Sequence, residues 1–132
     1  MPIVSTREYL TTKAVRLLSY RPRSVAEIRQ RLKKTNADTK TINSVIQELE
    51  DQDLLNDHKF AAWWVDQRVT FRPRGNFALT QELKQKGIAD SIIKSNLLTY
   101  EQELKLAKKL PAKKLASRGF SFSIIDALAH SR

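Results

Sequence analysis

A five-residue motif occurs twice in this chain, at a spacing of 51 residues. Residues 20–24 read YRPRS and residues 71–75 read FRPRG. The same spacing then relates further pairs, namely Gln30 and Gln81, Leu32 and Leu83, Lys33 and Lys84, and Ile42 and Ile93. A shorter similarity at a spacing of 32 relates residues 83–93 to 115–125. Self-similarity at a fixed period predicts a repeat protein, in which function lies on a surface formed by similar units and not in one catalytic cleft.

The apolar residues recur at helical spacing. One stripe comprises Leu10, Ala14, Leu17 and Leu18, and a second comprises Ile42, Val45, Ile46 and Leu49. Such stripes indicate amphipathic helices, and we expect an all-α fold without strands. We predict tandem three-helix units over residues 1–52, 53–98 and 99–132. The third unit should be shortened, in its first helix or in the link that follows, because its spacing of 32 is nineteen residues less than 51.

Helix boundaries follow from capping residues. Capping boxes are predicted at Ser5 with Glu8, at Ser24 with Glu27 and, more weakly, at Thr99 with Gln102. Asp38 is a predicted N-cap, and Asn56 or Asp57 is another. Gly87 and Gly119 are expected to end the middle helices of the second and third units, Gly87 in a left-handed conformation.

The chain is strongly basic and contains no cysteine. Twenty-four Lys and Arg against fourteen Asp and Glu give a net charge of +10, which favours a polyanionic partner. The absence of cysteine, of a signal-peptide-like run and of any membrane-spanning stretch predicts a cytoplasmic protein that contacts no membrane. The acidic segment from Glu48 to Asp57 could pair internally with a basic face or contact a partner, and the sequence leaves both open.

Enzyme classes have little support. His58 and His130 show no metal-ligand spacing such as HExxH, and no cysteine is present to complete a zinc site. The aspartates at 51, 53 and 57 lack the glycine and closing glutamate of a calcium loop. No P-loop or GxGxxG motif is present. We therefore expect no catalytic residue, no metal and no cofactor.

The repeated motif supplies the first candidates for partner binding. Arg21, Arg23, Arg72 and Arg74 occupy equivalent turns between helices, and a guanidinium suits bidentate recognition of phosphate or carboxylate. The alternative is that these arginines cap the carbonyls of the preceding helix. Lys84 and Lys86 are weaker candidates, for which a plain solvated face is the more economical interpretation.

Two adjacent tryptophans add an aromatic candidate. Neighbouring helical residues point about 100° apart, so Trp63 and Trp64 cannot share one narrow stripe. Trp64 lies on the face of Phe60 and is expected in the core. Trp63 could stack on a base or dock a partner, or it could pack between units. Tyr20 and Phe71 occupy matching repeat positions, and packing is the expectation for both.

Several phrases in order resemble the RecX family of regulatory proteins. They are LND at residues 55–57, FA at 60–61, Arg68, RG at 74–75, ELKQKGI at 82–88, LASRGF at 115–120 and II at 124–125. The resemblance spans about residues 9–129. It implies tandem three-helix units in an elongated, curved array, and a cytoplasmic, non-catalytic regulator, here expected to be a monomer. Such a regulator binds the RecA recombinase filament on single-stranded DNA and inhibits strand exchange, ATP hydrolysis and coprotease activity.

A second function from another class remains open. One three-helix unit could act as an autonomous DNA-binding module of the helix-turn-helix kind. No unit, however, has an obvious reading helix with several Arg, Asn or Gln residues.

Overall fold

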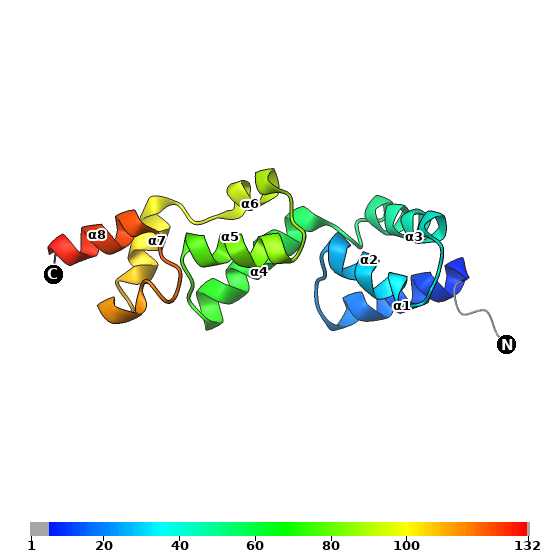
Figure 1. Ribbon diagram of the computed structural model, residues 1–132, viewed down its shortest axis with the longest axis horizontal. Helices are drawn as coiled ribbons and strands as arrows, with labels where there is room; N and C mark the ends of the chain where they lie inside the picture. The colour runs from blue at the N-terminus through cyan, green and yellow to red at the C-terminus, as the bar shows by residue number, and fades with distance from the viewer. Residues whose placement is uncertain (1–5, 132) are drawn as a thin grey trace. The chain divides into compact units, whose positions relative to one another are not determined.

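The computed structural model describes residues 6–131, and within that range every regular element is helical (Figure 1). The elements are α1 (Arg7–Tyr20), α2 (Val25–Lys33), α3 (Thr39–Asp51), α4 (Asp57–Phe71), α5 (Asn76–Gln85), α6 (Asp90–Asn96), α7 (Tyr100–Ala107), the 3₁₀ turn η1 (Ala112–Lys114) and α8 (Phe122–Ser131). The predicted all-α fold is confirmed. No helix in this range is both long and apolar enough to span a membrane.

The chain forms two compact units. The first runs to Phe60 and also includes the short segment Lys86–Ile88, and the second comprises Ala61–Gln85 and the residues from Ala89 onward. In the first unit α1, α2 and α3 pack on one another in pairs. Its core contains both predicted stripes, with Leu10, Ala14, Ile42, Val45, Ile46 and Leu49 buried and Leu17 and Leu18 packed at the edge. Burial of these stripes holds the first three helices together.

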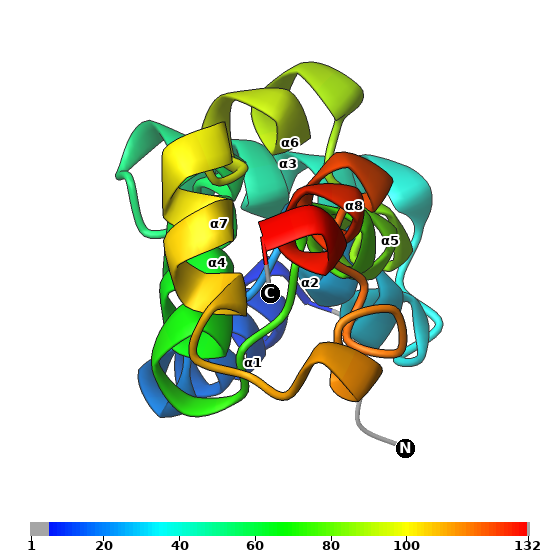
Figure 2. The ribbon, with the colours of Figure 1, turned by 90° about the vertical axis from the view of Figure 1, so that its left-hand side faces the viewer.

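In the second unit, α8 packs against α7 and η1 (Figure 2). The core of this part contains Leu106, Ala107, Leu115, Phe120, Ile124 and Leu128. A middle α-helix ending at Gly119 was predicted here, and that prediction is wrong. The residues after Pro111 form only the single turn η1, followed by turns up to Gly119. The helix α7 has eight residues against fifteen for α4, and α6 has seven against thirteen for α3. The shortening is therefore spread over α6, the first helix of the third unit and its middle element.

The caps agree with the sequence predictions where the structure describes them. Ser24 with Glu27 and Thr99 with Gln102 form complete capping boxes, and the Asp38 carboxylate accepts the N–H of Thr41 at 2.7 Å. Of the two alternatives for α4, Asn56 is the cap, because its Oδ1 accepts the N–H of Lys59 at 3.1 Å. The predicted Ser5 cap lies outside the described residues. Gly87 has φ of 78°, as its predicted left-handed conformation requires.

Candidate partner-binding surface

The first Arg-Pro-Arg turn joins α1 to α2, and its first arginine is held by an ion pair. Arg21 Nη2 lies 2.7 Å from Glu27 Oε2, and Arg21 Nη1 donates to the carbonyl of Pro22 at 2.7 Å. Lys86 Nζ lies 3.2 Å from the same Glu27 oxygen. Both cations were candidates for partner binding, and both are already engaged by one carboxylate. The solvated face expected for Lys86 is therefore wrong, since its side chain is half-buried and paired with Glu27.

Glu27 is the centre of this arrangement. Burial raises the pKa of its carboxyl, but hydrogen bonds from Arg21, from the Ser24 N–H and from Lys86 outweigh the burial, so the pKa is lowered overall. The Ser24 N–H donates to Glu27 Oε1 at 3.0 Å, completing the capping box of α2. The carboxylate thus fixes the start of α2 and the side chain of Arg21 at the same time.

Arg23 caps the end of α1. Its Nε donates to the carbonyl of Leu17 at 3.3 Å, which satisfies one of the carbonyls left open at a helix C-terminus. Partial burial and the nearby Arg21 charge lower the pKa of Arg23. The capping alternative considered for these arginines is thus observed at Arg23. A binding role for it remains a prediction.

The second Arg-Pro-Arg turn, between α4 and α5, is built differently. Arg72 is exposed and forms no ion pair with any residue in the range 6–131. Arg74 is half-buried, and its Nε is buried without a hydrogen-bond partner in that range. The repeat position of Glu27 is occupied by Ala78, so no carboxylate stands there to engage the second turn. Arg72 is therefore the most available of the four predicted arginines.

The remaining candidates divide between solvent and packing. Lys84 is exposed on α5, as its solvated-face interpretation expects. Trp63 is half-buried and meets Trp64 edge to face, with ring centroids 6.2 Å apart. Trp64 is also only half-buried, contrary to the core position predicted for it. Its indole N–H donates to Glu82 at 2.9 Å, and Arg68 lies over its ring at 4.8 Å.

The packing predicted for two other aromatic residues is wrong. Tyr20 is 76% exposed and Phe71 is 71% exposed. Each lies at the last residue of its helix, α1 or α4, where the chain turns into the Arg-Pro-Arg link. The core stripes end before these positions, so both rings are left on the surface.

Two carboxylates, for which the sequence analysis predicted no such contact, join the start of a middle helix to the first helix of the following three-helix unit. The backbone N–H of Val25, at the start of α2, donates to Asp57 Oδ1 at 2.8 Å. The N–H of Asn76, at the start of α5, donates to Glu103 Oε2 at 2.9 Å. Val25 and Asn76 are related by the spacing of 51, and each amide is satisfied by a carboxylate from a later helix. These two carboxylates could have been found from the similarity of DHKFA at 57–61 to ELKLA at 103–107, in which Asp57 and Glu103 occupy the same position.

The turns that follow α5 and η1 also return to these helix starts. Ser24 Oγ donates to the carbonyl of Lys86 at 2.7 Å, and the N–H of Gly75 donates to the carbonyl of Arg118 at 3.0 Å. A Cβ on Gly75 would lie 2.2 Å from the Cα of Phe120, so only glycine permits this approach. The two Arg-Pro-Arg turns therefore precede equivalent, closely packed junctions.

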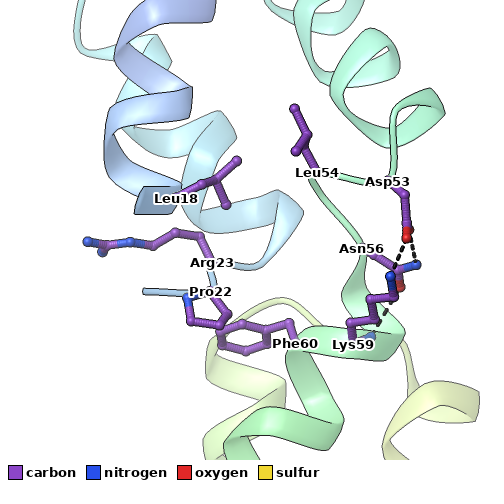
Figure 3. Close-up of a pocket in the computed structure, with 8 residues that line it drawn as sticks. All are labelled: Leu18, Pro22, Arg23, Asp53, Leu54, Asn56, Lys59 and Phe60. Atoms are coloured by element: carbon purple, nitrogen blue, oxygen red, sulfur yellow. Dashed lines mark hydrogen bonds and ion pairs between the residues drawn. The ribbon is translucent and has the colours of Figure 1, made fainter. Parts of the chain in front are cut away.

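A pocket of about 310 Å³ lies beside the first turn (Figure 3). Leu18, Pro22, Leu54 and Phe60 provide most of its apolar lining. Figure 3 shows the Arg23 guanidinium directed away from the Lys59 and Asp53 side chains. The pocket holds no cluster of potential metal ligands, and no such cluster of three or more occurs within residues 6–131.

Two family models match the chain in order. The model described as the first three-helix domain of RecX matches residues 12–49, and the model described as its second three-helix domain matches residues 56–97. The chain belongs to the RecX family. The matches cover α2, α4, α5 and α6 in full and most of α1 and α3, so both Arg-Pro-Arg turns lie in family domains.

Individual RecX proteins support the assignment. The chain is 36% identical to the regulatory protein RecX of Bacillus subtilis over 87% of this chain and 52% of that protein. It is also 36% identical to that of Prosthecochloris aestuarii, over 73% of this chain and 63% of that protein. Among solved structures, RecX from Lactobacillus salivarius superposes with a TM-score of 0.82 at 26% identity, covering 95% of each chain. The chain spans about half the length of several curated RecX relatives that it matches.

The acidic segment of this RecX-family chain makes internal contacts. Arg7 pairs with Glu48, Lys59 pairs with Asp53, and Gln47 donates to Asp51 at 2.9 Å. Asp57 receives the Val25 N–H described above, and its burial raises the pKa of the carboxyl. Internal charge pairing, one of the two alternatives left open by the sequence, is thus observed for Glu48 and Asp53, whereas Asp51 and Asp57 accept hydrogen bonds from uncharged donors.

Proposed function

We propose that this protein binds the RecA recombinase filament on single-stranded DNA and inhibits its recombinase, ATPase and coprotease activities. The observation that carries the proposal is the ordered match to the first and second three-helix domains of RecX. The relatives are named regulatory proteins, and the proposal extends this role to the present chain as a non-catalytic monomer of the cytoplasm. It also retains the division into three units at residues 1–52, 53–98 and 99–132.

The charge distribution supports a polyanionic target. The net charge is +10, and Arg72 is an exposed cation at a turn without a carboxylate partner in the described range. An exposed guanidinium can approach phosphate or carboxylate without first breaking an ion pair. Arg21 and Lys86 would have to leave Glu27 before they could do so. We therefore rank Arg72 first among the proposed contacts, with Arg74 and Lys84 after it.

The alternative of a sequence-reading DNA-binding unit has less support. In the first unit α3 would be the reading helix, yet its last turns carry Glu48, Glu50 and Asp51. These carboxylates would repel the phosphates that flank a DNA groove.

A binding comparison tests the proposal. Because the chain has no cysteine, the Lys113→Cys variant can be labelled with one fluorophore on an exposed turn. The labelled protein is titrated with RecA filaments preformed on single-stranded DNA, and separately with free RecA and duplex DNA. The proposal predicts tightest binding to the filament. Equal or tighter binding to duplex DNA would support the alternative, and no binding to the filament would refute the proposal.

A further inference from the structure

A groove of about 270 Å³ runs along α1, and none of the residues proposed to contact the filament lines it. Its lining includes Tyr9, Lys13, Arg16 and Tyr20 from α1, and Arg31 from α2. The groove therefore combines aromatic rings with cations on one surface of the first compact unit.

The two tyrosines lie on one side of the helix. Tyr9 and Tyr20 are eleven residues apart, which in an α-helix corresponds to about 16 Å along the axis and almost the same angular direction. Tyr9 is 42% exposed and Tyr20 is 76% exposed. Both rings therefore present a free surface to solvent, and the cations Lys13 and Arg16 lie between them along the helix.

The charge of the groove has one sign. Lys13, Arg16 and Arg31 form no ion pair or hydrogen bond through their side chains within residues 6–131. No carboxylate is among the lining residues. Three uncompensated cations beside exposed aromatic rings complement a ligand that is both anionic and flat-faced.

The second compact unit has a groove at the corresponding position, on its first helix α4. A groove of about 210 Å³ on α4 is lined by Trp63, Trp64, Gln67, Arg68, Phe71 and Arg72. At the spacing of 51 residues, Thr12, Lys13, Arg16 and Tyr20 of the first groove correspond to Trp63, Trp64, Gln67 and Phe71 of the second. An exposed aromatic residue thus ends the first helix of both repeats, and cations accompany it in both grooves.

We infer that the α1 groove, and the repeat-related groove on α4, bind single-stranded nucleic acid directly. An unpaired base stacks on an exposed ring, Tyr20 in the first groove and Phe71 in the second. The neighbouring cations engage the flanking phosphates, as stacking platforms in other single-strand binders do. An acidic peptide would satisfy the cations but would leave the exposed rings without flat partners. This binding requires no recombinase. The α1 groove is lined by none of the proposed filament contacts, so variants of Tyr20 test it apart from filament inhibition, whereas the α4 groove shares Arg72 with those contacts.

Fluorescence anisotropy tests the inference with the unlabelled full chain and an end-labelled oligo-dT at low salt, without recombinase or nucleotide. Tyr20→Ala should weaken binding about tenfold, as expected for loss of one base stack. Tyr20→Phe should retain the affinity. The matched control is Tyr100→Ala, because Tyr100 is 49% exposed on α7 and lies outside both grooves. Circular dichroism verifies that each variant keeps its helicity.

Two further measurements distinguish the contribution of base stacking to binding from the contribution of charge. Arg16→Gln should reduce the dependence of log Kd on log salt concentration by about 0.7, as for one phosphate contact to a single strand, whereas Lys113→Gln should not. An abasic oligomer of the same length loses the stacks on both Tyr20 and Phe71, so it should bind more weakly than oligo-dT by more than about tenfold, and Tyr20→Ala should not weaken that binding further. The inference fails if oligo-dT is not bound, if polyglutamate binds as well as oligo-dT, or if Tyr20→Ala and Tyr100→Ala bind alike. Filament inhibition measured separately would be unaffected by any of these failures.

Discussion

Asp57 Oδ1 accepts the backbone N–H of Val25 at 2.8 Å and so satisfies the first amide of α2 from a residue thirty-two positions later. A helix start normally leaves such amides to water or to a local cap. Here a carboxylate at the beginning of α4 takes that role, and Glu103 repeats the contact at the beginning of α5. The arrangement ties each middle helix to the first helix of the next repeat.

Replacing Asp57 should measure the strength of this tie. Asp57→Ala removes a charged acceptor from a partly buried amide, and we expect the free energy of unfolding to fall by about 1.5–3 kcal/mol in urea titrations. Asp57→Asn retains a carbonyl acceptor with no charge to desolvate, so the free energy of unfolding should fall less for this variant than for Asp57→Ala. Asp66→Ala, on the exposed face of α4, is the control. Equal losses for Asp57→Ala and Asp66→Ala would contradict this role.

The ion pair of Glu27 predicts a pH dependence. Because its folded pKa is lowered, its contribution to stability is present above the unfolded value of about 4.3 and is lost as the pH falls through the folded pKa. Glu27→Gln should therefore be less stable than the parent at pH 7, by roughly 1–2 kcal/mol. The difference between the two proteins should shrink as the pH falls below about 4.

Chemical unfolding of both proteins between pH 3 and pH 8 provides the measurement. The raised pKa of Asp57 acts in the opposite direction, adding stability below its unfolded pKa that is lost as the pH rises through the folded value. It is present in both proteins and largely cancels in the difference. A stability difference independent of pH would show that Glu27 acts without its charge.

Gly87 should be sensitive to substitution for two separable reasons. Its φ is 78°, and an added Cβ would lie 2.4 Å from the Cβ of Ala26. We expect Gly87→Ala to lower the free energy of unfolding by about 2 kcal/mol or more, from left-handed strain and overlap together. In the Gly87→Ala/Ala26→Gly double variant the overlap is removed and only the strain remains.

A double-mutant cycle from urea titrations measures the recovery. After correction for the Ala26→Gly single variant, the double variant should regain about 1 kcal/mol relative to Gly87→Ala. If the two substitutions add with no coupling, the close approach of Gly87 to Ala26 is not the cause of the sensitivity.

Arg72 should matter for the partner and not for the fold. Arg72→Ala should leave the free energy of unfolding within about 0.5 kcal/mol of the parent, since the side chain is exposed and unpaired in the described range. It should weaken filament inhibition about tenfold in concentration, the effect of losing one charge-assisted contact. Lys113→Ala removes a charge of the same sign from an exposed turn and is the control. Identical inhibition by the two variants would exclude Arg72 from the contact.

Much of the fold could be predicted because it depends on local patterns. The stripe from Ile42 to Leu49 is fully buried. The side chains of Ser24 and Asp38 each accept a hydrogen bond from the backbone N–H three residues later. Helical periodicity and capping chemistry report such contacts directly. The predicted middle helix of the third unit is not formed. The similarity of residues 115–125 to residues 83–93 indicated related sequences, but it did not indicate how many residues would be helical, and the five residues between η1 and Phe120 form turns.

The candidate site was harder to predict because its contacts join distant residues. Arg21 and Arg72 look equivalent in the sequence, yet Glu27 pairs with one and Ala78 stands at the matching position of the other. Lys86 meets Glu27 across 59 positions, a contact that no local pattern reports. The exposure of Tyr20 likewise depends on where the core stripe ends in space.

The most direct test of the central proposal is the steady-state ATPase rate of RecA filaments preformed on single-stranded DNA. The protein is added only after filament assembly is complete, so that competition for free DNA does not contribute. We predict that the rate falls with increasing protein, saturably, and that Arg72→Ala requires about tenfold more protein for the same effect. An ATPase rate that stays unchanged while the protein is bound to the filament would contradict the proposal.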